Sequence, residues 1–222
     1  MAFTDSQHIK IAVDNVIFTV HGGVLQVLLI KMKRKPFAGS WALPGGLVGQ
    51  KETLDAAAIR VLQSETNVRD VYLEQLYTFS APKRDPRDRA ISTAYFALVP
   101  AGELKLKTNT KYDGVAWRPL AKIGKLAFDH NKIVEYAVKR LQWKLEYTNV
   151  VWSLLPDEFT LTDLQVIYEA VLGETLDKRN FRKKILALRL VEPTGKQIAQ
   201  GAHRPAQLYR FISRKPQMIS LL

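Results

Sequence analysis

Two runs of apolar residues near the start of the chain predict a pair of neighbouring strands. Lys10 to Val20 and Val24 to Lys33 are rich in Val, Ile and Leu, which favour extended structure. His21-Gly22-Gly23 lies between them, and a glycine pair in that position is typical of a tight hairpin turn. Further strand-like runs lie at 71–79, 91–99 and 115–120.

Two helices are predicted in the same part of the chain. The first begins near Thr53. The second covers Asn131 to Tyr147, where apolar residues repeat at steps of four, three and four, as they do on one helix face. Strands combined with helices in this order predict one mixed α/β (α+β) domain, which we assign to residues 1–148.

The pattern of apolar residues changes after this domain, where Pro156 interrupts regular secondary structure. Thr160 and Asp163 have the spacing of a capping box, so they predict the start of a helix. Gly173 is placed to end that helix, because glycine readily adopts the left-handed conformation that follows a helix. We therefore assign residues 149–222 to a second domain.

A second helix is predicted shortly afterwards, with Phe181 and Ile185 on its apolar face. Two short helices joined by a tight turn are typical of a helix-turn-helix. The segments 190–193 and 207–211 can pair as strands, which leaves Thr194 to Ala206 as a projecting wing. The second domain is therefore predicted to be a winged helix-turn-helix.

Charge supports that interpretation. The chain has 33 basic and 21 acidic residues, a formal charge of +12, so a polyanion or a phosphorylated ligand is the expected partner. Asp157 to Asp177 holds six acids and no Lys or Arg, whereas Lys178 to Lys215 holds eleven basic residues and one acid. The sign changes where a recognition helix would begin, which favours binding to double-stranded DNA. The alternative is that this helix merely presents a solvated face.

Other features of the composition exclude several classes of protein. The chain has no Cys, which excludes disulfides, thiol nucleophiles and Cys-based zinc fingers. Met1 to Lys10 lacks the pattern of a signal peptide, and the longest apolar run, near Val27 to Ile30, is far too short to cross a bilayer. We expect a cytoplasmic protein with no membrane partner.

The segment from Gly46 to Val68 resembles the Nudix box, a motif of enzymes that split diphosphates with magnesium. The residues that fit its spacing are Gly46, Glu52, Arg60, Leu62, Glu65 and Val68. Val61, Ser64 and Asn67 stand where the motif has Glu, Glu and Gly.

Two of the three helix carboxylates that hold magnesium in the family are therefore missing. Magnesium needs several converging oxygen ligands, so we expect no catalytic residue and no metal centre. Glu52 and Glu65 remain weak candidates for binding a metal. We expect Arg60 and Glu52 to keep a structural role, with the guanidinium forked onto the carboxylate before the helix.

With both halves considered, the chain resembles the NrtR family, the Nudix-related transcriptional regulators of NAD metabolism. The segments that carry the resemblance are 72–79, 84–89, 176–184 and 201–206. It implies a Nudix-like sandwich with a C-terminal winged helix-turn-helix. It also implies a homodimer that represses NAD biosynthesis or salvage genes from a palindromic operator and is released by ADP-ribose or a related nucleotide. Asp88 departs from the family pattern, which has Gly there.

ADP-ribose offers a diphosphate, two riboses and an adenine, so it needs guanidinium donors, carboxylates and flat apolar surfaces. The candidate ligand-binding residues are Phe37, Trp41, Arg60, Glu65, Glu74, Arg84, Asp85, Arg87 and Arg89. Two alternatives stay open here. The aromatic residues can instead belong to the core, and Arg84 and Arg89 can instead pair with Asp85 and Asp88 at the surface.

For DNA, we expect four residues in the major groove and the others nearer the backbone. The groove candidates are Arg179, Asn180, Arg182 and Lys183, and the backbone candidates are Thr162, Lys178, Lys184, His203 and Arg204. Arg and Asn can pair with base edges, whereas Lys mainly neutralises phosphate.

Two competing functions remain at this point. In one, the chain is an active ADP-ribose pyrophosphatase in which Glu52, Glu65 and Glu74 still collect magnesium, and the basic domain is accessory. In the other, it is a general nucleic-acid-binding module with an empty pocket. The predicted sensor requires no cofactor, binds ADP-ribose as its effector and leaves the role of magnesium open.

Overall fold

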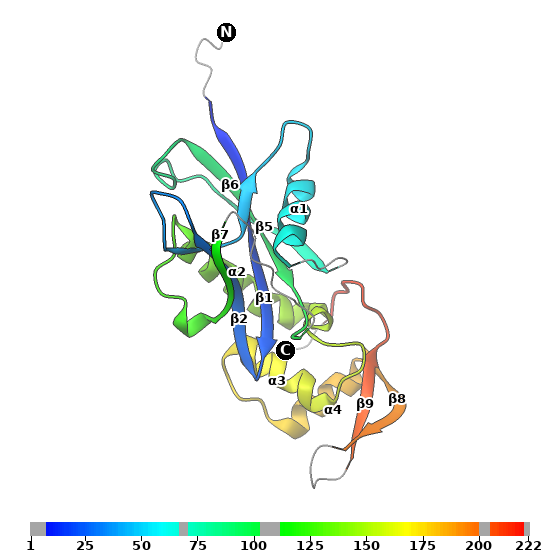
Figure 1. Ribbon diagram of the computed structural model, residues 1–222. Helices are drawn as coiled ribbons and strands as arrows, with labels where there is room; N and C mark the ends of the chain where they lie inside the picture. Colours follow the sequence, from blue (N-terminus) through cyan, green and yellow to red (C-terminus); the bar gives the residue numbers. More distant parts are fainter. Residues whose placement is uncertain (1–7, 67–70, 103–111, 200–204, 220–222) are drawn as a thin grey trace. The chain divides into compact units, whose positions relative to one another are not determined.

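The computed structural model describes residues 8–66, 71–102, 112–199 and 205–219, without the side chains at 65 and 66. The chain folds into two compact units (Figure 1). The first comprises the described residues of 1–17, 27–97 and 104–137, and the second those of 18–26, 98–103 and 138–222. Because each unit is built from several segments, the units do not test a single boundary at residue 148, which stays a prediction.

A mixed sheet of seven strands has the order β3-β2-β1-β6-β5, with β4 pairing to β1 and β7 pairing to β2. The strands are β1 (Lys10–His21), β2 (Val24–Met32), β3 (Trp41–Ala42), β4 (Gly45–Leu47), β5 (Tyr72–Phe79), β6 (Ala90–Leu98) and β7 (Tyr112–Pro119). Gly22 and Gly23 join β1 to β2 with φ angles of 57° and 73°, values that favour glycine. The predicted hairpin is therefore confirmed.

The two faces of β1 contact different helices, because successive side chains of a strand point to opposite sides. Val13 packs against α1 (Leu54–Thr66), and Asn15 Nδ2 donates to the Ala58 carbonyl of that helix at 2.8 Å. Asp14 points the other way, towards His130 at the start of α2 (His130–Tyr147). The sheet thus lies between two helical layers, which confirms the predicted α/β sandwich.

The apolar side of α1 completes one part of the core. Val61 is 3% exposed and clusters with Val13, Ala57, Ala58 and Tyr95. Val61 thus serves as a core residue at the position where the Nudix box has a metal-binding carboxylate. A Glu buried among these apolar neighbours would lose most of its hydration, which is costly unless a cation is nearby.

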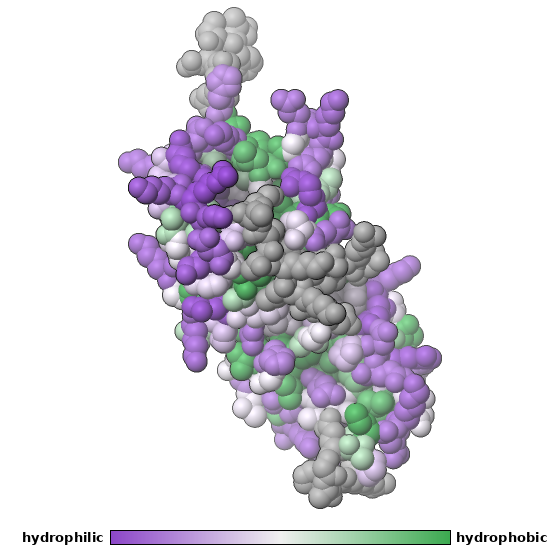
Figure 2. Space-filling model, in the orientation of Figure 1, coloured by the Kyte–Doolittle hydropathy of each residue, from purple (hydrophilic) through white to green (hydrophobic). Residues whose placement is uncertain are grey.

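The second helix confirms its predicted amphipathic pattern. Val134, Leu141 and Leu145 of this helix are buried. Two 3-10 helices precede and follow α2 along the chain, η1 (Leu120–Lys122) and η2 (Val150–Leu154). On the face shown in Figure 2, hydrophilic residues predominate and apolar residues form small separate groups, as expected for a surface in contact with water. No helix of the described residues is long and apolar enough to cross a membrane.

The second unit contains the predicted helix-turn-helix, formed by α3 (Leu161–Leu172) and α4 (Lys178–Ala187). Thr160 and Asp163 make the complete capping box, and Gly173 ends α3 with a φ angle of 77°. Asp177 caps α4 by accepting from the backbone N–H of Asn180, a cap that the sequence analysis did not identify. These caps satisfy backbone groups that would otherwise lack partners at the helix ends.

The wing differs from the prediction. Strand β8 spans Val191–Ile198 and pairs with β9 (Ala206–Phe211), so the residues 194–198 belong to a strand rather than to the loop. The register shifts between Pro193 and Gln197, an irregularity that lets β8 continue past Pro193 and Gly195. The predicted strand ended at Pro193, so the prediction that the wing begins at Thr194 was wrong.

Candidate functional site

A cavity of about 310 Å³ lies on the face of β1 that is turned away from α1. Its walls include alternate β1 residues Lys10, Ala12 and Asp14, the loop between β5 and β6, and the chain that leads into α2. The volume is at the small end of the range for ligand sites. The alternation of β1 side chains explains why the cavity lies on this face of the sheet, because only every second residue of the strand points towards it.

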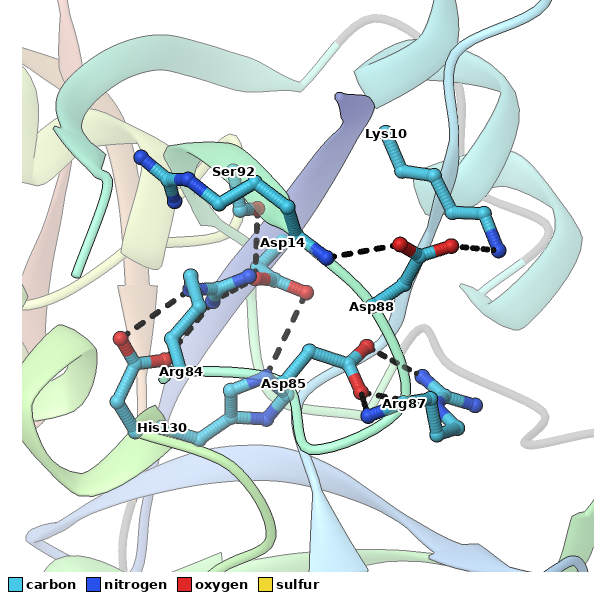
Figure 3. A network of polar contacts seen from close by, with 10 residues as sticks. Lys10, Asp14, Arg84, Asp85, Arg87, Asp88, Ser92 and His130 are labelled. Atoms are coloured by element: carbon cyan, nitrogen blue, oxygen red, sulfur yellow. Dashed lines mark hydrogen bonds and ion pairs between the residues drawn. The ribbon is translucent and has the colours of Figure 1, made fainter. Parts of the chain in front are cut away.

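Ion pairs and hydrogen bonds among buried groups form the cavity floor (Figure 3). Arg84 donates to Asp14 at 3.1 Å and to Asp129 at 2.8 and 3.2 Å, and the Ser92 hydroxyl donates to Asp14 at 2.7 Å. Burial lowers the pKa of Arg84, but the two carboxylates outweigh burial and hold that pKa above its ordinary value. The guanidinium therefore stays charged and ties the β5–β6 loop to β1 and to the start of α2.

His130 is also part of this floor, and its hydrogen bonds fix its protonation. Its Nδ1 accepts from the backbone N–H of Leu43 at 2.9 Å, and its Nε2 lies 3.6 Å from Asp14 Oδ1. An acceptor nitrogen carries no proton, so the proton of the neutral ring is on Nε2. Burial lowers the pKa of His130, against the attraction of Asp14.

This arrangement predicts a pH dependence of stability. A histidine whose pKa is lower when folded than when unfolded stabilises the fold above about pH 6.5, and the stabilisation is lost as the pH falls from there towards the folded pKa. We expect His130→Gln, whose amide oxygen can accept from Leu43, to show a smaller loss of stability over this interval. Urea unfolding from pH 7.5 to 5 measures the effect, and equal slopes for both proteins would contradict it.

The cavity rim has two further ion pairs, both more exposed than those of the floor. Arg87 forks onto Asp85 at 2.7 and 2.9 Å, and Lys10 lies 2.8 Å from Asp88. The Arg87 guanidinium is the main cause that lowers the pKa of Asp85. The predicted loop residues Arg84, Asp85 and Arg87 therefore all line the cavity, whereas Arg89 does not and its side chain donates to the Ala90 carbonyl.

The alternative prediction, in which the loop arginines pair with Asp85 and Asp88 at the surface, was wrong about the partner of Arg84. Arg84 pairs with Asp14 and Asp129 rather than with Asp85, and Asp88 pairs with Lys10. The reason is topological, because β1 runs beside β6 and brings Asp14 to the loop, while Asp129 comes from the chain just before α2. The sequence places those groups 70 and 45 positions away from Arg84.

Phe128 is an aromatic wall of the cavity that the sequence analysis missed. Its φ angle of 55° is unusual for a residue other than glycine, and such conformations cluster at functional sites. Its ring centroid lies 4.3 Å from that of Phe37, and the Arg87 guanidinium lies 5.3 Å from its own centroid. No sequence signal identified Phe128 beyond its position just before a predicted helix.

The two aromatic residues that were predicted to contact the ligand are Phe37 and Trp41, and neither belongs to the cavity lining. Phe37 packs against Phe128 and does not itself line the cavity. Trp41 lies on β3 with the Arg118 guanidinium 5.0 Å from its ring centroid, also outside the lining. Their contact with a ligand remains a prediction.

The Nudix-box residues on α1 adopt the predicted structural arrangement. Arg60 donates to both carboxylate oxygens of Glu52, at 2.5 and 3.0 Å, and to the Leu47 carbonyl at 3.0 Å. Hydrogen bonding to Arg60 is the main cause that lowers the pKa of Glu52. This confirms the fork between the two side chains, and neither of them lines the cavity.

The described box residues do not fit a magnesium centre. Glu52 is occupied by Arg60 and by the backbone N–H of Gly49, Val61 is buried, and the Ser64 hydroxyl donates to the Val61 carbonyl at 2.9 Å. Glu74 accepts from the Tyr72 hydroxyl. The side chain of Glu65 lies outside the described residues, so its predicted roles stay predictions.

The candidate DNA-binding residues gather on α4 and at the start of α3. The exposed ones are Thr162, Lys178, Arg179, Asn180, Lys183 and Lys184. Arg182 is partly buried, and its Nη2 donates to the Thr162 hydroxyl at 3.0 Å. His203 and Arg204 lie outside the described residues. The helices thus bring Thr162 and Arg182 together although they are 20 positions apart.

The fold and the cavity define a Nudix-type sandwich that is followed by a winged-helix unit. Residues 8–139 match the NUDIX domain, and residues 151–211 match the NrtR DNA-binding winged helix domain. The chain is 41% identical over 203 residues to the ADPR responsive transcriptional repressor NtrR of Acinetobacter baylyi, covering 90% of this chain and 80% of that protein. The chain therefore belongs to the NrtR family.

Solved structures agree with this assignment. The crystal structure of Shewanella oneidensis NrtR complexed with a 27mer DNA superposes with a TM-score of 0.81 at 35% identity, covering 90% of this chain and 93% of that chain. The NUDIX domain of the same protein complexed with ADP ribose has a TM-score of 0.55 at 35% identity, covering 62% and 90%.

An enzyme is also among the relatives. The ADP-ribose pyrophosphatase of Methanocaldococcus jannaschii is 37% identical over 137 residues, which is 62% of this chain and 76% of that protein. The similarity is therefore shared between a repressor and a hydrolase.

Proposed function

We propose that this chain is a transcriptional repressor that senses ADP-ribose through its Nudix domain and binds operator DNA through its winged helix. The relatives named as an ADPR responsive repressor and as NrtR in complex with DNA support this role over nearly the whole chain. The observation that carries the proposal is that one chain combines a cavity, lined by apolar side chains and by ion-paired groups of both signs, with a helix-turn-helix in which α4 carries five basic residues. The regulated genes belong to NAD biosynthesis or salvage.

The cavity offers complementary chemistry for the parts of ADP-ribose. The exposed cations Arg87 and Lys10 suit the diphosphate, Asp14 and Asp85 suit ribose hydroxyls, and Phe128 offers a flat apolar surface to the adenine. Arg84 is held by two carboxylates, so its main contribution is to shape the floor. Lys10 and Phe128 thereby join the ligand candidates identified from the sequence.

The ligand changes operator affinity through its differential affinity for two states of the protein. A homodimer on a palindromic operator matches the two-fold symmetry that helix-turn-helix proteins share with their sites. Within each chain, the first domain ends near residue 148 and the second begins at residue 149. The effector is bound without being consumed, so magnesium is not required for release.

We expect ADP-ribose to dissociate the complex of this protein with its operator. Gel-shift titration with and without magnesium measures release, and thermal unfolding measures binding, since a ligand at 100 times its Kd stabilises by about 2.7 kcal/mol. AMP alone is the matched control because it lacks the distal ribose and the diphosphate. An operator complex that is indifferent to millimolar ADP-ribose would contradict the sensor role.

The second candidate function is ADP-ribose hydrolysis, which is favoured by the similarity to the archaeal pyrophosphatase. The burial of Val61 and the engagement of Glu52 by Arg60 argue against it, because both positions lack a carboxylate free to bind a metal. Release of AMP from ADP-ribose and magnesium, abolished by Glu65→Gln, would establish the enzyme instead.

A further inference from the structure

Among the described residues, each Lys or Arg that lines the cavity already contacts a carboxylate of the same chain. Arg84 contacts Asp14 and Asp129, Arg87 contacts Asp85, and Lys10 contacts Asp88. An anionic ligand therefore has to exchange partners with one of these pairs before it gains a full ion pair. The cost of that exchange depends on which pair is opened.

The floor and the rim differ sharply in exposure. The Arg84 side chain is 5% exposed, whereas Lys10 and Asp88 are 53% and 41% exposed. Water and salt screen an exposed pair, so it separates easily, while opening a buried pair leaves an uncompensated charge. The Lys10–Asp88 pair is consequently one that an incoming phosphate can open at low cost.

Asp88 is held in place to make this contact. One carboxylate oxygen accepts from the backbone N–H of Arg89 at 2.9 Å, and the other faces Lys10 (Figure 3). Lys10 is the first residue of β1, and Asp88 belongs to the β5–β6 loop, so the pair joins two walls of the cavity. The hydrogen bond with Lys10 is the main cause that lowers the pKa of Asp88, as expected for a carboxylate that is stabilised by a neighbouring cation.

We propose that Asp88 competes with the phosphates of the ligand for Lys10 and thereby raises the ligand concentration at which the cavity fills. The inference rests on the proposed function, since it assumes a diphosphate-containing nucleotide in this cavity. Asp88 acts here as a residue that sets affinity. A carboxylate at the rim weakens anion binding in two ways, by occupying the cation and by repelling the phosphate.

Calorimetric titration of the full chain with ADP-ribose tests this competition. We expect Asp88→Asn, which keeps the shape and removes the charge, to lower the Kd about three-fold, the size typical of exposed ion pairs. The gain should shrink as salt rises from about 50 to 500 mM, because screening weakens exposed pairs. Glu158→Gln is the matched control, since Glu158 pairs with Lys196 at 2.9 Å in the other unit and does not line the cavity.

A double-mutant cycle with Lys10→Met separates competition from simple repulsion. If Asp88 acts by occupying Lys10, Asp88→Asn should gain clearly less in the Lys10→Met background than in the native protein. An equal gain in both backgrounds, or no gain in the native protein, overturns the inference while ADP-ribose binding itself stands. Absence of any heat or thermal stabilisation with native protein overturns the proposed function instead.

Discussion

Replacing Arg84 by Met is expected to lower the free energy of unfolding by about 3–5 kcal/mol, the cost of leaving a buried charge without its partner. Arg84 is 5% exposed and contacts both Asp14 and Asp129, so its loss leaves two largely buried carboxylates without their shared guanidinium. Equilibrium unfolding in urea measures the change. We also expect the variant to bind ADP-ribose more weakly than the native protein in a calorimetric titration, because the cavity floor loses the contacts that fix its geometry.

Arg87→Met is the matched control for this substitution. Arg87 comes from the same loop and also forms an ion pair, with Asp85, but its side chain is 51% exposed. The Asp85 side chain is itself only 12% exposed, but the cation is in contact with water, so we expect this variant to lose clearly less stability than Arg84→Met. Similar losses for the two variants would contradict the assignment of Arg84 as the buried centre of the floor.

A second test removes one of the two carboxylates that lose their cation in Arg84→Met. In the Arg84→Met background, Asp129→Asn removes one of the two unpaired charges while it keeps the size of the side chain. We expect part of the lost stability to return, because the penalty comes from buried charge rather than from lost packing. A further loss of stability would show that Asp129 has another essential partner.

Local signals predicted the parts of this molecule whose partners are close in sequence. The capping box of Thr160 and Asp163 spans three positions, and the fork between Arg60 and Glu52 spans eight. Both depend on the geometry of one helix and the turn before it, which a sequence pattern specifies almost completely. The helix-turn-helix and the hairpin at Gly22-Gly23 were predicted for the same reason.

The cavity floor could not be predicted in this way. Asp14 lies inside the apolar run of β1, where a single carboxylate gives no indication of its partner. Its contacts come from Arg84, Ser92 and His130, which lie in the β5–β6 loop, on β6 and at the start of α2, and only the tertiary fold brings these segments together. Phe128 was missed because neither its left-handed backbone nor its place in the cavity wall leaves a sequence signature.

Val61 combines a feature that the sequence revealed with one that only the structure shows. The sequence showed that a metal-binding carboxylate was absent, and the structure adds that Val61 contributes to a buried cluster with Ala57, Ala58 and Val13. The residue therefore has its own stabilising role and is more than a lost ligand. Returning Glu to this position would have to overcome the cost of burying its charge, so a single substitution is a poor route back to hydrolysis.

Replacing Arg182 by Ala is expected to weaken binding to the operator about 5- to 150-fold, the range that corresponds to one bidentate contact with a base. Arg182 lies on α4, where its Nη2 donates to the Thr162 hydroxyl at 3.0 Å, and its Nε is shielded from solvent without a hydrogen-bond partner among the described residues. This tether orients the guanidinium before DNA arrives, which lowers the entropy lost on binding. Fluorescence anisotropy with operator and scrambled duplexes measures both affinities.

Three companion variants separate base reading from phosphate contact. Arg182→Lys keeps the charge but loses the planar fork, so it should retain affinity for scrambled DNA and lose preference for the operator. Thr162→Val keeps the shape and removes the tether, so we expect a smaller loss of the same preference. Lys184→Ala should weaken both duplexes alike and reduce the salt dependence, as expected for a phosphate contact. If Arg182→Ala also weakens both duplexes equally, Arg182 touches only phosphate, and the base contact must come from another residue of α4.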